Sequence, residues 1–323
     1  MSHPITPLIA SVENEFKTLD DIILTRIASK VGLAEEISAY LVNAGGKRVR
    51  PLLTLLALKA LGKEDERGTL LAASIEFLHT ATLLHDDVVD ESEQRRGRDT
   101  ANQVWGNAPS VLAGDFVYTR AFQLMVDVGD MQILKELADT TNTIAEGELQ
   151  QLINKGDVDV DETAYFDVIY AKTARLFEAA GRVAGLLANA SETQTRGLAE
   201  YGRLIGLAFQ IADDALDYQR DADSGKSLGD DLAEGKITLP ILIARDALPT
   251  DQARWLDMQF TRANGDALDE VIEKLEATQA LERTLERAEN LADQAIAELA
   301  PLPESEFKAH LVTLAHIAAR RNS

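Results

Sequence analysis

Two pairs of aspartates stand in apolar parts of the sequence, where an unpaired carboxylate is energetically expensive. Asp86 and Asp90 close the stretch LHTATLLHDDVVD, and Asp213 and Asp217 lie in FQIADDALDY. The members of each pair are four positions apart, so both carboxylates would share one face of a helix. Carboxylates in an apolar helix must be protonated, paired or bound to cations. The two clusters together predict two walls of one divalent-metal site.

The metal site competes with a simpler explanation, because most acidic runs are solvated faces or interact with a helix N-terminus. Either cluster alone would be a weak signal, but the same pattern occurs twice, each time after apolar turns. The sequence has no cysteine and no HExxH motif, so oxygen ligands favour Mg²⁺ over zinc. Because Mg²⁺ readily binds phosphate oxygens, the substrate is expected to be phosphorylated.

Basic residues provide the matching charge for such a substrate. The strongest pattern is AGGKRVRP, in which Lys47, Arg48 and Arg50 follow a Gly-Gly turn and lead to a helix beginning near Pro51. A basic loop at a helix N-terminus is suited to anions, since the unpaired amides and the helix dipole add to the side chains. The phosphate-binding motifs GxxxxGK[ST] and GxGxxG are both absent from the sequence.

One histidine lies in register with the first aspartate cluster. His79 is two turns before Asp86 on the same expected face, and Thr82 completes the polar stripe. A histidine in an apolar helix is usually a satisfied core residue, but beside metal-binding carboxylates it can donate to a phosphate. His85 has the weaker case and is expected to be structural.

The composition favours one all-α domain over residues 1–323, with roughly ten or more helices. Hydrophobic residues make up 46% of the chain and aromatic residues only 5%, with abundant alanine and leucine. No alternating strand pattern and no dividing linker occur. Helices are expected at residues 7–30, 131–155, 166–189 and 196–218, with Ser110 opening another.

Charge and apolar runs limit the possible partners and location. The net charge of −22 argues against a nucleic-acid partner, and the absence of cysteine excludes disulfides. The first residues, MSHPITPLIASVENEF, lack the basic start and apolar run of a signal peptide. No apolar stretch reaches the roughly 18–20 residues that span a bilayer. These features predict a soluble, cytoplasmic protein.

Five motifs occur in an order that resembles a known enzyme family. These motifs are GGKRVRP, HTATLLHDDVVDESEQRRG, AKTARLF, FQIADDALDY and GDDLAEGKITLP. Through them the sequence resembles trans-isoprenyl (polyprenyl) diphosphate synthases, and most of all the bacterial octaprenyl branch. The resemblance implies the isoprenoid synthase fold, which is a bundle of helices around a central cavity, a homodimer, and a prenyltransferase that condenses isopentenyl diphosphate onto an allylic diphosphate. Farnesyl diphosphate is the expected primer, and octaprenyl diphosphate for the ubiquinone side chain the expected product.

The resemblance also implies roles for individual residues. A cluster of Mg²⁺ ions, about three per site, would be held by carboxylates: Asp86, Asp90 and Asp213. The allylic diphosphate would contact Arg95, Lys172, Thr173, Gln210 and Lys226. Isopentenyl diphosphate would contact Lys47, Arg50, His79 and Arg96. Asp87, Asp214 and Asp217 would act as outer-shell or water-mediated partners of the metals. Lys236 would join the diphosphate ligands when a flap, the segment DADSGKSLGDDLAEGKITLP, closes.

Product length is expected to depend on the residues just before the first cluster. Short-chain members of the family carry bulky aromatic residues four and five positions before the first aspartate. Here those positions hold Thr82 and Ala81, which are small, and the resemblance therefore implies a product longer than farnesyl or geranylgeranyl diphosphate. Candidates for the end of the tunnel are Phe77, Leu78, Phe122 and Met125.

Three alternatives are weighed against this function. One is a shorter-chain synthase that makes farnesyl or geranylgeranyl diphosphate. A terpene cyclase shares the all-α fold and one DDxxD but normally lacks the second DDxxD and GGKRxRP. A non-catalytic synthase subunit would have eroded aspartate clusters, whereas these are complete. The long apolar prenyl chain of the product would favour weak peripheral membrane contact, although no strongly basic amphipathic helix is evident.

Overall fold

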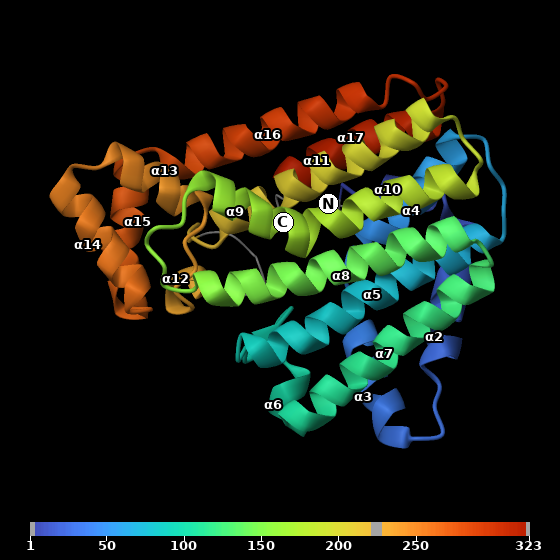
Figure 1. The fold of residues 1–323 in the computed structure, drawn as a ribbon, viewed down its shortest axis with the longest axis horizontal. Helices are drawn as coiled ribbons and strands as arrows, with labels where there is room; N and C mark the ends of the chain where they lie inside the picture. Colours follow the sequence, from blue (N-terminus) through green and yellow to red (C-terminus); the bar gives the residue numbers. More distant parts are fainter. Residues whose placement is uncertain (1–3, 221–227, 321–323) are drawn as a thin grey trace. The chain divides into compact units, whose positions relative to one another are not determined.

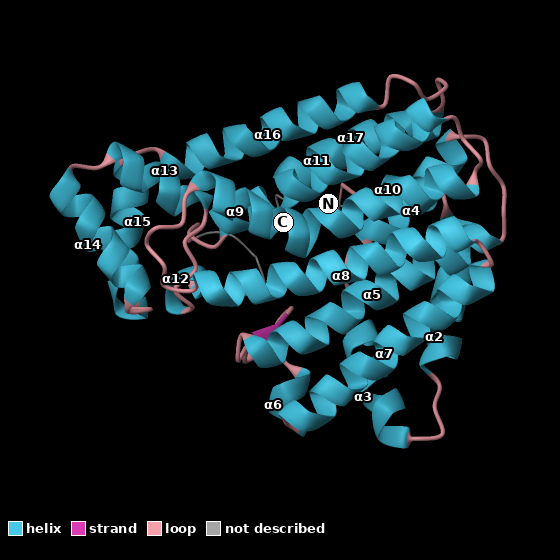
Figure 2. Ribbon diagram, in the orientation of Figure 1, coloured by secondary structure: helices cyan, strands magenta, loops and turns pink. Residues whose placement is uncertain are grey.

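The computed structural model describes residues 4–220 and 228–320, which fold almost entirely into helices (Figure 2). This confirms the all-α class. The described chain forms two compact units. The first comprises Met1–Thr141, Leu176–Gly202 and Glu298–Leu314, and the second comprises Asn142–Arg175, Arg203–Ala297 and Ala315–Ser323. A single domain over residues 1–323, with its central cavity, stays a prediction.

The first unit is organised around the long helix α5 (Arg67–Val89), which packs against helices earlier and later in the chain (Figure 1). Buried side chains lie on several of its faces, as expected of a central helix. The other elements of this unit are α1 (Thr6–Ala10), α2 (Glu13–Ile27), α3 (Gly32–Asn43), α4 (Val49–Ala60), β1 (Gln94–Arg95), β2 (Arg98–Asp99), α6 (Ala101–Trp105) and α7 (Asn107–Val128).

The second unit contains shorter helices and a rare π-helical turn. Its elements are α9 (Glu162–Ile169), the π-helix Tyr170–Ala174, α12 (Asp230–Ala233), α13 (Leu239–Ala247), α14 (Thr250–Thr261), a 3₁₀ turn (Gly265–Ala267) and α15 (Leu268–Ala277). Five helices contribute residues to both units: α8 (Met131–Asn154), α10 (Arg175–Leu187), α11 (Glu192–Leu216), α16 (Ala280–Glu298) and α17 (Glu306–Arg320).

Three local expectations from the sequence were wrong. The helix expected at residues 7–30 is broken between α1 and α2, where Val12 leaves the helical region with φ −131° and ψ 34°. The helix expected to open at Ser110 begins at Asn107, and Ser110 is buried in its first turn. The single helix expected at residues 166–189 is instead α9, the π-helix and α10.

A small hairpin was also missed. Strands β1 and β2 pair antiparallel directly after the first aspartate cluster, with Arg96 and Gly97 at the turn. Both turn residues have positive φ, 54° and 72°, which is the conformation that a two-residue hairpin turn of type I′ requires. Strands of two residues are too short to show an alternating pattern in the sequence.

Candidate functional site

The first aspartate cluster ends the central helix of the first unit. Asp86 lies in the last turn of α5, and Asp90 is the residue that caps its C-terminus. The Asp90 amide still donates to the Asp86 carbonyl at 2.8 Å, so the helical turn continues and the predicted spacing of the two side chains is kept. Both are partly exposed. They are therefore accessible carboxylates at the end of a rigid helix.

The third acid of this cluster has a different environment. Asp87 is only 1% exposed, and burial raises the pKa of its carboxyl while Arg95 opposes that rise. The Nε and terminal guanidinium nitrogens of Arg95 lie 2.8 and 2.7 Å from Asp87 Oδ1. Asp87 thus holds Arg95, a predicted diphosphate ligand, in place by a charge-assisted contact.

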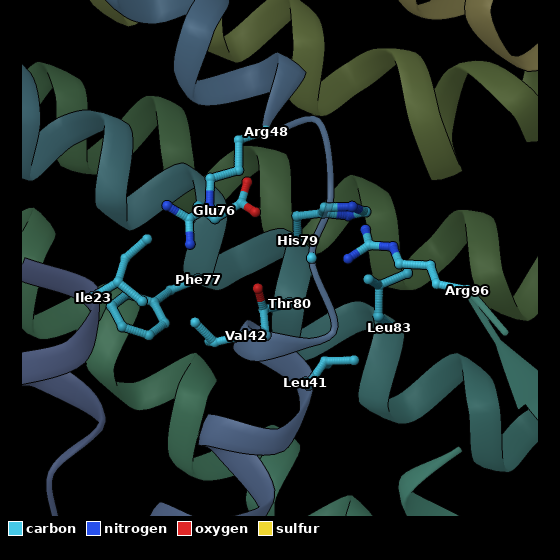
Figure 3. A pocket seen from close by; sticks show the side chains of 11 residues that line it. Ile23, Leu41, Val42, Arg48, Glu76, Phe77, His79, Thr80, Leu83 and Arg96 are labelled. Carbon is cyan, nitrogen blue, oxygen red and sulfur yellow. The ribbon is translucent and has the colours of Figure 1, made fainter. Parts of the chain in front are cut away.

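A narrow cavity brings together two of the four predicted isopentenyl diphosphate ligands, whereas Lys47 and Arg50 are not among its lining residues (Figure 3). His79 of α5 and Arg96 of the hairpin turn line it, together with Arg48. The space open to the centres of water molecules is about 20 Å³. A Cβ atom at Gly46 would lie 2.7 Å from an Arg96 guanidinium nitrogen, so this exposed arginine covers the Gly-Gly loop and would have to shift for a diphosphate to enter.

The basic loop is held by contacts that its sequence alone does not reveal. Arg48 caps the N-terminus of α4 in the left-handed region, with φ 44°, and forms an ion pair with Asp20 of α2. Arg50 is 9% exposed, and its guanidinium lies 4.4 Å from the centre of the Phe177 ring. Lys47 is partly exposed in the loop.

The two histidines of α5 have different surroundings. Burial, and then the charges of Arg50, Arg96 and Arg95, hold the pKa of His79 well below its ordinary value. His79 is therefore neutral near pH 7 and offers one N–H donor to the cavity. His85 Nε2 lies 3.2 Å from the Val111 carbonyl oxygen and 3.3 Å from Asp115. These contacts with α7 support the structural role expected for His85.

In the second unit, Asp214 is the centre of a hydrogen-bond network. It is 4% exposed and accepts from the Tyr165 hydroxyl at 2.5 Å and from Gln210 Nε2 at 2.8 Å. The Thr173 hydroxyl donates in turn to Gln210 Oε1 at 2.8 Å. Two predicted diphosphate ligands, Thr173 and Gln210, are thus oriented by one buried carboxylate, while Asp213 is partly exposed.

Tyr165 was not identified from the sequence, and its role can be measured. Burial and the Asp214 charge raise the pKa of Tyr165 well above its ordinary value, so its hydroxyl keeps the proton it donates. Tyr165→Phe removes a donor from a buried carboxylate, and we expect urea denaturation to show a free energy of unfolding lower by about 1–3 kcal/mol. Tyr40→Phe is the control, because the partly exposed Tyr40 donates to the backbone carbonyl of Asp99 and not to a buried carboxylate. Equal losses in the two variants would contradict this prediction.

Lys172 is placed by a close approach of two helical segments. A Cβ atom at Gly147 of α8 would lie 2.5 Å from the Ala171 Cβ and 3.1 Å from the Lys172 amide nitrogen. Only glycine therefore allows α8 to pack this closely on the π-helix. The next residue, Glu148, forms an ion pair with Lys172 at 2.8 Å. A π-turn that carries predicted ligands is typical of functional sites.

Asp217, the last acid of the second cluster, and Lys236 make local contacts. Asp217 accepts from the amides of Asp230 and Asp231 at 3.2 and 3.1 Å, which caps α12. Lys236 forms an ion pair with Glu234 at 2.5 Å. Lys226 lies outside the described residues. The outer-shell and flap roles of Asp217 and Lys236 stay predictions.

The donors of both clusters suit a hard divalent cation. Asp86 and Asp90 in the first unit, and Asp213 in the second, are partly exposed carboxylates, and Mg²⁺ takes one or two carboxylates from a protein and completes its shell with water and phosphate. Within residues 4–220 and 228–320, no group of three or more histidine or acidic side chains is already gathered for a metal. By their donor chemistry, the three carboxylates fit a hard divalent cation such as Mg²⁺.

The chain is similar to characterised enzymes over nearly its whole length. The polyprenyl synthetase family model matches residues 31–275. Octaprenyl diphosphate synthase of Escherichia coli (strain K12) is 49% identical over 302 residues, 93% of this chain and 94% of that protein. All-trans-nonaprenyl-diphosphate synthase (geranyl-diphosphate specific) of Rhodobacter capsulatus is 43% identical over 316 residues, 97% of each protein.

A solved structure agrees with these relatives. Polyprenyl synthase from Caulobacter crescentus CB15, complexed with calcium and isoprenyl diphosphate, superposes with a TM-score of 0.92 at 39% identity, covering 98% of this chain and 97% of that chain. GGKRVRP and both aspartate clusters lie inside residues 31–275. The matched region therefore contains every residue assigned to the candidate site.

Proposed function

Because this chain belongs to the polyprenyl synthetase family, we propose that it is a prenyltransferase that makes octaprenyl diphosphate from isopentenyl diphosphate and an allylic primer. The family match and the long-chain synthases among the relatives confirm the interpretation of the five motifs as those of a long-chain trans-prenyl synthase. The observation that carries the product is the 49% identity to an octaprenyl synthase over 93% of the chain. Because another relative makes nonaprenyl diphosphate, a product one isoprene unit longer is the second candidate.

The proposed reaction has three steps. The bond between the allylic carbon and its diphosphate oxygen breaks, the isopentenyl double bond attacks the resulting cation, and the released diphosphate accepts the proton lost from the new product. Protein groups position the substrates and exclude water, so no side-chain nucleophile is required. That agrees with the lack of cysteine in the sequence.

We propose separate groups of side chains for the metal ions and for each of the two substrates. Divalent-metal binding is supported by the calcium-bound neighbour, and we propose about three Mg²⁺ ions, which would neutralise the charge of the departing diphosphate. Their proposed ligands are Asp86, Asp90 and Asp213. The proposed ligands of the allylic diphosphate are Arg95, Lys172, Thr173, Gln210 and Lys226. Those of isopentenyl diphosphate are Lys47, Arg50, His79 and Arg96, where neutral His79 donates one hydrogen bond.

We also propose a homodimer and a role in ubiquinone synthesis, with farnesyl diphosphate as primer. Exposed apolar side chains on α7 support the dimer, since Leu112 and Val126 are 66% and 63% exposed. None of the described helices is long and apolar enough to cross a membrane. The cytoplasmic location stays a prediction.

A product assay tests the function directly. Purified protein is incubated with Mg²⁺, radiolabelled isopentenyl diphosphate and farnesyl diphosphate, and the dephosphorylated products are sized by reversed-phase chromatography. We expect a main octaprenyl band that disappears when EDTA removes the metal. A farnesyl or geranylgeranyl band would keep the enzyme class but contradict the chain-length argument from Ala81 and Thr82. No elongation with any primer would favour a cyclase or a non-catalytic subunit.

A further inference from the structure

Glu76 is an acidic residue in a cavity otherwise lined by arginines, a histidine, a threonine, a glycine and apolar side chains. It lies on α5 three positions before His79, so the two share a face of the helix. Among the described residues that line this cavity, Glu76 is the one acid, and it lies there with Arg48 and Arg96 (Figure 3). Neither the motifs nor the proposed reaction gives this carboxyl a role.

The charge of Glu76 is only partly compensated in the structure. Its electrostatic neighbours are three arginines, Arg48, Arg50 and Arg96. Arg48 already has a direct partner in Asp20. Within residues 4–220 and 228–320, no salt bridge includes the Glu76 carboxylate. Burial raises the pKa of Glu76, and the three arginines offset this rise only in part.

A diphosphate in this cavity would change that balance. It brings negative charge to the same arginines, and a like charge nearby disfavours an ionised carboxylate. An ionised Glu76 would repel the ligand, whereas a protonated Glu76 can donate its O–H to a phosphate oxygen. The neutral acid is therefore the form that suits an occupied cavity.

We propose that Glu76 takes up a proton from solvent when isopentenyl diphosphate enters this cavity, so that binding of this substrate is coupled to protonation of a carboxyl. The inference rests on the proposed function, because it takes isopentenyl diphosphate as the occupant. It concerns binding only, and no covalent bond is made or broken in this step.

Other charged groups lie near Glu76, and their effects must be separated from its own. Three of them are arginines, Arg48, Arg50 and Arg96, and an arginine side chain is not deprotonated in proteins. Asp20 of α2 is paired with Arg48, and the side chains of α3 that line the cavity, Leu41 and Val42, are apolar. His79 is the remaining group that can titrate, and a diphosphate would favour its charged form as well.

The proposed protonation of Glu76 fixes how the affinity for isopentenyl diphosphate changes with pH. If the Glu76 pKa is higher in the complex than in the free protein, the affinity for isopentenyl diphosphate is greatest below the free-protein pKa. It falls as the pH rises towards the pKa of the complex. Glu76→Gln is neutral at every pH, so its affinity should not fall over this range.

The experiment is isothermal titration calorimetry of the full chain with isopentenyl diphosphate, with EDTA present so that the metal-dependent allylic site is not filled. Titrations at one pH in two buffers of different ionisation enthalpy give the number of protons taken up. We expect uptake of up to about one proton per site in the wild type, and its loss in Glu76→Gln with affinity retained. Glu66→Gln, at an exposed position at the start of α5, is the matched control and should keep the uptake.

His79→Asn completes the design, because uptake at Glu76 should persist without the histidine. Proton uptake unchanged in Glu76→Gln, or binding without uptake in the wild type, would overturn the inference and leave the function intact. An affinity at least tenfold lower in Glu76→Gln at every pH would also overturn it, since an ionised carboxylate would then be needed to hold the arginines. A wild type that neither binds isopentenyl diphosphate nor elongates a primer would overturn the proposed function itself.

Discussion

Asp86→Ala is expected to lower kcat by at least about 1,000-fold while the protein stays folded, because a metal-binding carboxylate stabilises charge that develops in the transition state. The Asp86 side chain is partly exposed at the end of α5, so its truncation leaves no large buried void. Its carbonyl, which accepts from the Asp90 amide, is unaffected. Steady-state kinetics and circular dichroism measure the two quantities.

Asp213→Ala should give a loss of the same size, because the two clusters are proposed to serve one metal site. Asp21→Ala is the control for removal of a carboxylate, since Asp21 is exposed on α2. If Asp86→Ala lost activity and Asp213→Ala kept it, the proposal of two walls would be wrong. Full activity in both variants would contradict metal-dependent chemistry at these clusters.

The sequence predicted helices best where their formation depends on local pattern. The apolar run before Asp86 indicated α5, and the periodicity of residues 131–155 indicated α8, which ends at Asn154. The π-helix at Tyr170–Ala174 could not be predicted, because it accompanies the close approach of Gly147 to Ala171. Contacts between segments distant in the chain carry no local signal.

The same distinction holds for the candidate site. Aspartates and cations were identified because their type and spacing are unusual in apolar surroundings. Their supporting partners were missed, since Asp20 contacts Arg48 and Tyr165 contacts Asp214 only in the folded chain. Glu76 did have a signal, as an acid in an apolar helix three positions before His79. It became informative only when the structure placed it among arginines.

Ala81→Tyr is expected to shorten the product from octaprenyl towards farnesyl or geranylgeranyl length. Ala81 is 0% exposed on α5, the helix that packs on α7 and ends in the first aspartate cluster. A phenol ring there must occupy space that the proposed growing chain would use. The reverse-phase product assay measures the change, and the Michaelis constant for isopentenyl diphosphate should stay within a few-fold, because the cations of the cavity are untouched.

A larger side chain at the buried position of Ala81 also lowers the free energy of unfolding, by about 1–3 kcal/mol for overpacking. Two further variants are therefore needed for comparison. Ala81→Ser adds little volume and should keep the octaprenyl product. Thr82→Phe adds an aromatic ring at the neighbouring, partly exposed position, where the native hydroxyl donates to the His79 carbonyl at 2.8 Å. If Ala81→Tyr and Thr82→Phe were folded, active and still octaprenyl-producing, product length would have to be set elsewhere. Phe77 or Met125, both buried, would then be the positions to enlarge or truncate next.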